Sequence, residues 1–202
     1  MLDGGFRFVG GRLSLNFVMT LSGRYRESPG EERLASPKDL GQWCQAAGLM
    51  PEPPVVRRSD LAAARELREA LYRLLQPESR RLSRPADVAT LNRWARLGGL
   101  RRVLCEDGRS VRIDARSPVR ACLSAVAVDA VDLLSGPLLG HVRECERSHC
   151  SMLFLDTSRA GRRRWCDMAR CGNRQKAAQH RRSRRYGEGS RPTDRTGVTP
   201  GH

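Results

Sequence analysis

The 202-residue chain is predicted to be mainly α-helical, with one or two short β-hairpins in its N-terminal part and a small cysteine-rich module after it. Three observations predict this arrangement. Apolar residues recur at helical spacing in four segments, glycine and proline separate these segments, and four of the seven cysteines cluster near the C-terminal end. We therefore expect a helical domain over residues 1–140, a cysteine-rich module over residues 141–186 and a disordered tail over residues 187–202.

Two segments of the N-terminal part have the pattern of β-hairpins. Residues 6–15 form two short alternating runs around a Gly-Gly pair, which suits a tight turn. Residues 103–113 contain two β-rich runs on either side of an Asp-Gly pair, which favours the same kind of connection. We expect the first hairpin to open the fold and the second to lie between the later helices.

Four helices are predicted in the N-terminal domain. Residues 34–48 contain Ser36 followed by proline, so the serine can cap a helix whose first turn holds the proline. Residues 59–75 carry leucines at helical spacing, and residues 84–99 begin with Arg-Pro-Ala-Asp and end in two glycines. Residues 118–134 are apolar on more than one face, which predicts a central core helix.

The cysteines near the C-terminal end form two matched pairs. Their spacing is Cys145-x4-Cys150, fifteen residues, and then Cys166-x4-Cys171. Paired cysteines on two tight knuckles can close a tetrahedral four-sulfur site around one structural Zn²⁺, in a treble-clef or ribbon-like module. The short apolar run over residues 152–156 is expected to be a strand that covers the metal, and the boundary between the two domains is expected near residues 135–144.

Alternative ligand sets remain open at this stage. His149 or His180 could replace a cysteine, although His149 is adjacent to Cys150 and His180 lies nine residues beyond Cys171. A catalytic zinc would keep an open position, whereas four thiolates close the shell, and the sequence has no P-loop, dinucleotide fingerprint or nucleophile elbow. We therefore expect no enzymatic activity. The other three cysteines, Cys44, Cys105 and Cys122, are expected to be buried free thiols.

Positive charge is concentrated around the paired cysteines. The formal net charge is +15, and residues 145–186 hold twelve basic and three acidic residues, a net +9. A basic surface beside a zinc module is typical of a protein that neutralises nucleic-acid phosphates. Duplex DNA is the expected partner, with RNA or an acidic protein as the alternative. The candidate phosphate-binding residues are Arg162, Arg163, Arg164, Arg174, Lys176, Arg181, Arg182 and Arg185.

The residues that flank the second cysteine pair have more specific expected roles. Residues 174–186 have the composition of a basic helix that could lie against a duplex. Trp165 is expected to shield the metal, although it could also stack on a base. Asn173 is expected to cap the helix.

The composition also indicates a cellular context. The sequence has no apolar run of 18 residues for a membrane span and no signal-peptide pattern in its first twenty residues. We therefore expect a cytoplasmic protein, associated with the nucleoid through DNA, that makes no membrane contact. In that compartment thiols stay reduced, so clustered cysteines indicate a metal site.

The string from Cys166 to Arg174, together with the preceding residues 154–158 and 163–165, resembles the CGNR zinc finger of bacterial proteins. The N-terminal part is similar to the ABATE domain that accompanies this finger, through residues 8–13, 32–34, 67–71 and 91–92. The ABATE family is described as stress-induced transcriptional regulators. The resemblance implies a mostly helical N-terminal module, zinc binding by all four paired cysteines, DNA binding and control of transcription. We expect the N-terminal domain either to sense a small-molecule or protein signal or to mediate assembly.

The chain departs from the family pattern at two polar positions. Where the family often reads Leu-Asp-Phe-Val-Asn-Thr, residues 15–20 contain Asn16 and Met19, so a carboxylate and a carboxamide are replaced. If these polar positions hold a ligand or a buried hydrogen-bond network in relatives, that role is in question here.

Overall fold

The computed structural model describes residues 5–24, 30–76, 84–147 and 150–178. About half of the described residues are helical, and they also form two small antiparallel hairpins, which confirms the predicted fold class. In chain order the elements are α1 Leu13–Val18, α2 Pro37–Ala46, α3 Arg58–Leu75, α4 Pro85–Ala95, β1 Arg101–Leu104, β2 Val111–Asp114, α5 Pro118–Ser135, the 3-10 helix η2 Pro137–His141, β3 Val142–Glu144, β4 Leu153–Leu155 and the π-helical turn η3 Met168–Gly172.

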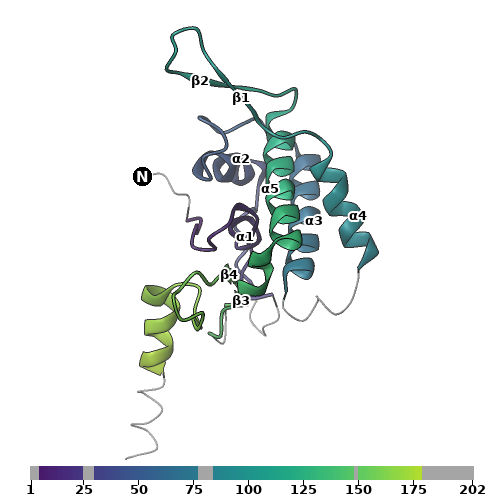
Figure 1. The fold of residues 1–202 in the computed structure, drawn as a ribbon. Coiled ribbons are helices and arrows are strands. Elements are labelled where there is room, and N and C mark those ends of the chain that lie inside the picture. Colours follow the sequence, from purple (N-terminus) through teal and green to yellow (C-terminus); the bar gives the residue numbers. More distant parts are fainter. Residues whose placement is uncertain (1–4, 25–29, 77–83, 148–149, 179–202) are drawn as a thin grey trace, which may run out of the picture.

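Helices α3, α4 and α5 lie side by side in the bundle, with α1 and α2 beside them (Figure 1). The hairpin β1–β2 projects from one end of this bundle, and the cysteine-bearing segment lies at the other end (Figure 1). The hairpin pairs Leu104 with Val111 next to its turn, as the Asp-Gly pair predicts. The cysteine-bearing segment and the hairpin β1–β2 are therefore far apart in the molecule.

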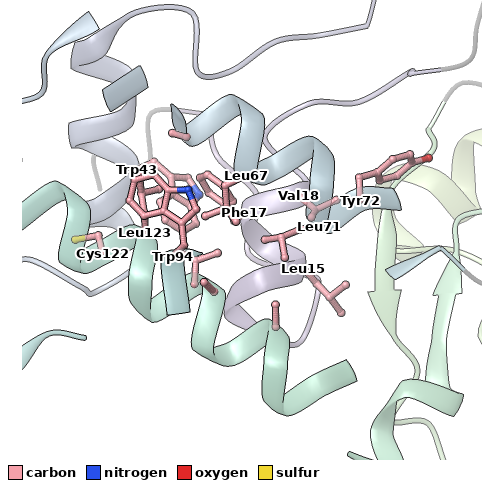
Figure 2. Close-up of a cluster of buried hydrophobic side chains, with 14 of the residues drawn as sticks. Leu15, Phe17, Val18, Trp43, Leu67, Leu71, Tyr72, Trp94, Cys122 and Leu123 are labelled. Atoms are coloured by element: carbon pink, nitrogen blue, oxygen red, sulfur yellow. The ribbon is translucent and has the colours of Figure 1, made fainter. Parts of the chain in front are cut away.

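The core is built from the inner faces of the predicted helices. Trp43, Phe17, Leu67, Leu123 and Trp94 gather at its centre, as Figure 2 shows. The rings of Phe17 and Trp43 meet edge to face, with their centroids 4.8 Å apart. The helix α5 supplies fully buried residues from several positions around its axis, which confirms its prediction as the central core helix.

The Ser36 cap that was predicted for the helix over residues 34–48 is confirmed at the start of α2. The Ser36 hydroxyl accepts a hydrogen bond from the Asp39 backbone N–H, and the Asp39 carboxylate accepts one from the Ser36 backbone N–H, at 2.6 Å. This capping box satisfies two of the N–H groups that the first turn of a helix leaves unpaired. Since Pro37 occupies the first position, the helix begins at residue 37 and not at residue 34.

The predicted N-terminal hairpin over residues 6–15 is wrong. Residues from Leu13 onward form α1, and the glycine pair before it passes close to β4. Gly11 has a φ of 83°, and a methyl group there would lie 3.2 Å from the Cβ of Leu155. The Gly10 carbonyl accepts a hydrogen bond of 2.8 Å from the Leu155 backbone N–H. The two glycines therefore allow the backbone before α1 to lie close to β4. The sequence around the glycines gives no sign of this contact.

The start of α1 is fixed by a carboxylate on α5. Asp129 accepts hydrogen bonds from the backbone N–H and the hydroxyl of Ser14, and it pairs with Arg12 at 2.9 Å. A negative charge at this position compensates the unpaired N–H groups of the first helical turn. A tertiary contact therefore stabilises a six-residue helix that would be too short to form alone.

The strands β3 and β4 join the C-terminal part to the helical core. Val142, Leu153 and Leu155 belong to the same buried cluster as the helix side chains. Residues on both sides of the expected domain boundary near residues 135–144 therefore pack in the same core. None of the helices within the described ranges is long and apolar enough to cross a membrane.

Candidate metal centre

Four sulfur atoms lie together at the end of the molecule that carries β3 and β4. The ligand atoms of Cys145, Cys150, Cys166 and Cys171 are all within 4.8 Å of one another. Cys166 Sγ lies 3.6 Å from both Cys150 Sγ and Cys171 Sγ, and the last two are 3.7 Å apart. A tetrahedral zinc with Zn–S bonds of about 2.3 Å requires S···S separations of about 3.8 Å. The four side chains therefore fit one Zn²⁺ with a closed shell.

The first knuckle turns the chain back between β3 and β4. The Cys145 backbone N–H donates to the Met152 carbonyl at 2.9 Å, and the Cys150 N–H donates to the Arg147 carbonyl at 3.1 Å. Ser151 has a φ of 51°, which is uncommon for a residue other than glycine. Its hydroxyl accepts a hydrogen bond of 3.1 Å from the Arg24 backbone N–H. The N-terminal part thus holds the turn that follows the second ligand.

The second knuckle is organised by Asp167. Its carboxylate accepts hydrogen bonds from the backbone N–H groups of Ala169 and Arg170, so it caps η3. Its carbonyl accepts from the Cys171 N–H at 2.9 Å, which places the fourth ligand. The expectation that Asn173 caps the helix is wrong, because Asn173 has helical dihedral angles and the helix continues through residues 173–178.

Two arginines contact the sulfurs from outside the ligand shell. Arg7 Nη2 lies 3.6 Å from Cys166 Sγ, and Arg147 Nη1 lies 3.7 Å from Cys171 Sγ. Burial disfavours the charged form of Arg7, but the nearby sulfurs, chiefly that of Cys166, outweigh this effect and raise the pKa of Arg7. Four thiolates around Zn²⁺ leave a net charge of −2, and these guanidinium groups offset it.

The thiols of Cys145, Cys150 and Cys166 do not titrate independently. Hydrogen bonds with Cys150 and Cys166 lower the pKa of Cys145, whereas hydrogen bonds with Cys145 and Cys150 raise the pKa of Cys166. The Cys145 thiolate is thus favoured, and Cys150 and Cys166 hold their protons more strongly. A divalent zinc bound here would displace those protons and supply the positive charge that lets all four sulfurs ionise.

Apolar side chains close the site against water. Met19, Met152 and Phe154 are buried with the cysteines, and Val9 and Trp165 pack against them. Trp165 therefore shields the metal site, as predicted. A methyl group at Gly172 would lie 3.4 Å from the Trp165 ring and closer still to the Met168 side chain, so this glycine permits the close packing of the knuckle.

The two departures from the family pattern have different structural outcomes. Asn16 accepts a hydrogen bond of 2.9 Å from the Gly10 backbone N–H through its side-chain oxygen. Met19 is 1% exposed and packs with the four cysteines. Position 16 therefore retains a hydrogen-bond acceptor, whereas position 19 contributes an apolar wall to the metal centre.

The loop that carries the three consecutive arginines is held by Asp156. This carboxylate is 1% exposed, and it accepts hydrogen bonds from the Ser158 hydroxyl at 2.6 Å and from the Arg163 backbone N–H at 2.8 Å. The bond from Ser158 is the main cause of the lowered pKa of Asp156. The side chain of Arg163 turns inward, where it donates to the carbonyls of Trp165 and Cys166 and lies over the Phe154 ring.

The remaining predicted phosphate-binding residues divide into two groups. Arg162, Arg164, Arg174 and Lys176 are exposed on the finger. Arg164 pairs with Glu146 at 2.5 Å and lies over the Trp165 ring, whereas Arg162 forms no hydrogen bond or ion pair with any residue that the structure describes. Arg181, Arg182 and Arg185 lie outside the described residues, as do the alternative ligands His149 and His180.

A buried ion network connects the first knuckle to α3. Arg68, only 2% exposed, makes two hydrogen bonds of 2.7 Å to Glu32 and one of 2.8 Å to Glu69. Arg24 also binds Glu69, at 3.0 Å, and its guanidinium lies 4.0 Å from the centre of the Tyr72 ring. Since the Arg24 backbone binds Ser151 beside the second ligand, this network positions the knuckle on the helical part.

Three residues of the centre were missed by the sequence predictions. Arg7 and Met19 carry no local signal of their role, because each reaches the sulfurs from more than 120 residues away in the chain. Asp167 could have been identified, since an aspartate directly before a helical segment is a preferred N-cap.

Comparison with known families agrees with this organisation. A family model named ABATE, described as "Putative stress-induced transcription regulator", matches residues 11–137, and the model of the CGNR zinc finger matches residues 141–185. Neither is an enzyme family. No curated protein matches the chain. The zinc-finger match and the four clustered sulfurs together identify the cofactor as one structural zinc ion.

Proposed function

The chain belongs to the ABATE family of transcription regulators and carries a CGNR zinc finger, and from this premise we propose that it is a bacterial regulator that binds duplex DNA through the zinc-bearing finger. Cys145, Cys150, Cys166 and Cys171 hold the zinc. Residues 141–186 form the DNA-binding module, and residues 1–140 form the regulatory domain that receives a signal. The zinc is structural, so its contribution is to fix the shape of the basic surface.

The observation that carries the proposal is the exposure of basic side chains on the finger that bears the sulfur cluster. Arg162, Arg164, Arg174 and Lys176 are exposed, whereas the four cysteines are buried. Cationic groups on a surface of this kind bind phosphates and release counterions, which gives affinity that falls steeply with salt. The buried cysteines would hold the zinc, and the exposed basic side chains of the same finger would be available to phosphates.

The arginines of the finger differ in the roles that their contacts support. Arg163 is occupied by the carbonyls of the second knuckle, so it supports the metal centre and contributes less to a DNA surface. Arg174 and Lys176 lie on the helix that follows the fourth ligand. Phosphate contacts from this helix would position the finger on the duplex, and sequence would be read by neighbouring groups in the groove.

The test is selection of bound fragments from a random duplex library by the zinc-loaded protein at about 150 mM salt, where surface charge is screened to the physiological range. The expected result is enrichment of one motif that is lost when a chelator removes the zinc. Binding without enrichment, or no binding, would contradict the proposal and favour RNA or an acidic protein as the partner.

A matched pair of variants separates a finger surface from general positive charge. Arg174→Gln removes a charge on the finger helix, and Arg112→Gln removes an exposed charge on β2 at the opposite end of the molecule. We expect the first change to weaken duplex binding and to reduce the slope of log K against log salt by about one. The second change should leave both unchanged. Equal effects of the two variants would contradict a finger-specific surface.

A further inference from the structure

A small pocket lies between the N-terminal segment and the finger, beside the first knuckle. Its volume is about 110 Å³, enough for a small polyatomic ion. Segments that are far apart in sequence supply its walls. The charged side chains that line it are Arg7, Arg33, Arg147, Arg170, Arg174 and Glu31.

The arginines of the pocket have spare hydrogen-bonding capacity. Arg33 donates to Glu31 at 2.7 Å and to the Gly5 carbonyl, but its Nε is buried and has no hydrogen-bond partner among the described residues. Arg170 and Arg174 form no side-chain hydrogen bond or ion pair with any residue in the described ranges. A buried donor without an acceptor is destabilising, and an oxyanion in the pocket would supply acceptors.

The pocket keeps a net positive charge when the ion pairs among its residues are taken into account. Arg7 and Arg147 face the sulfurs, and Arg7 also pairs with Asp167 at 3.3 Å, so their charge is shared with the metal centre. Glu31 compensates Arg33 in the pocket wall. Among the residues that the structure describes, the charges of Arg170 and Arg174 are then uncompensated, and both residues lie on successive turns of the same helix.

We infer that this pocket binds one tetrahedral oxyanion of the phosphate class, held by guanidinium groups from both the N-terminal segment and the finger. Arginine suits this ligand because its planar group presents several N–H donors in a fixed geometry and is always charged. The source is either a free phosphate or phosphomonoester or a backbone phosphate of DNA, since both present the same group. A bound anion would bridge Arg33 and Arg170 and so stabilise the contact between the two parts of the chain.

The first experiment measures binding of inorganic phosphate to the zinc-loaded full chain without DNA, by calorimetry at constant ionic strength. Arg170→Gln removes one pocket charge without removing a described contact of its side chain. Arg159→Gln removes an exposed arginine of the same finger that does not line the pocket. We expect Arg170→Gln to weaken phosphate binding about tenfold, in line with the loss of one charge-assisted hydrogen bond, and Arg159→Gln to change it less than twofold.

These measurements test the oxyanion site independently of whether the protein binds DNA. Absence of phosphate binding by the unchanged chain, or equal weakening by the two variants, would overturn it. Arg33→Gln provides a second pocket variant, and the zinc content of each variant confirms that the finger is folded. With specific duplex DNA added, release of phosphate would identify a DNA phosphate as the occupant, and simultaneous binding would identify a free anion; either result agrees with the oxyanion site.

Discussion

The guanidinium of Arg7 lies 3.6 Å from the sulfur of Cys166, a residue 159 positions later in the chain. The same group pairs with Asp167, the N-cap of the turn that carries the fourth ligand. Arg7 thus offsets the negative charge of the thiolates and also fixes the second knuckle. The metal centre is completed by a side chain from outside the finger.

Arg7→Gln is expected to lower the affinity for zinc by about 10- to 100-fold, the usual cost of removing a group that orients metal ligands. The measurement is competition with a chelator of known zinc affinity. Arg12→Gln is the matched control, because it removes another partly buried ion pair of the same segment, to Asp129, away from the cysteines. Equal zinc affinities for the two variants would show that Arg7 has no role at the site.

Cys166→Ser is expected to abolish zinc retention and to unfold the finger, because a hydroxyl cannot replace a thiolate in a four-sulfur site and because Cys166 touches two other ligands at 3.6 Å. Metal content per protein after gel filtration is the readout. Cys105→Ser, at a partly exposed cysteine outside the cluster, should keep one zinc per chain. Full zinc content in Cys166→Ser would contradict the assignment.

Removal of zinc should release the knuckles but leave β4 in place. Leu153 and Leu155 pack in the helical core, and the Leu155 N–H is bonded to Gly10, whereas the Cys171 N–H is bonded only within the second knuckle. Hydrogen exchange after chelation should therefore remain slow at Leu155 and become fast at Cys171. Fast exchange at both amides would show that β4 also depends on the metal.

Arg68→Met should destabilise the protein by about 3 kcal/mol, because it leaves Glu32 partly buried without its principal partner. The control is Arg93→Met, which breaks an exposed pair with Glu66 and should cost less than about 1 kcal/mol. Urea unfolding of zinc-loaded protein measures both. A cost for Arg68→Met as small as that of the control would show that the network contributes little to stability.

Stability should fall as the pH is lowered below about 5. Burial disfavours the charge of Glu32, but the hydrogen bonds and charge of Arg68 outweigh it, so the pKa of Glu32 is below its ordinary 4.5 in the folded protein. A lowered folded-state pKa contributes stability that is present above the unfolded pKa and is lost as pH falls through the folded pKa. Urea unfolding between pH 7 and pH 4 should show this loss.

Glu32→Gln should be less stable at pH 7 and should depend less on pH over the same range. Zinc release, followed in parallel with a metal-sensitive dye, separates this effect from protonation of the cysteines. An unchanged pH profile in Glu32→Gln would exclude Glu32 as a source of the acid sensitivity.

Local sequence signals predicted the features that depend on neighbours along the chain. The helices after residue 34, the hairpin around the Asp-Gly pair and the four-cysteine spacing all follow from periodicity, capping and turn chemistry. The prediction of an N-terminal hairpin was wrong because Gly10 and Gly11 have another structural role. They allow the backbone to pass close to Leu155 and to enter α1. Nothing within a short window distinguishes that requirement from a turn.

The sequence by itself determined the metal, since four cysteines at this spacing leave one soft divalent ion as the natural occupant, and it determined where positive charge is concentrated. The tertiary structure decided what surrounds the metal. Arg7, Met19 and Arg24 reach the knuckles only because β4 packs into the helical core beside residues 5–24. Burial and long-range hydrogen bonds, which no local pattern encodes, joined the finger to the helical part and placed Arg33 beside Arg170 in one pocket.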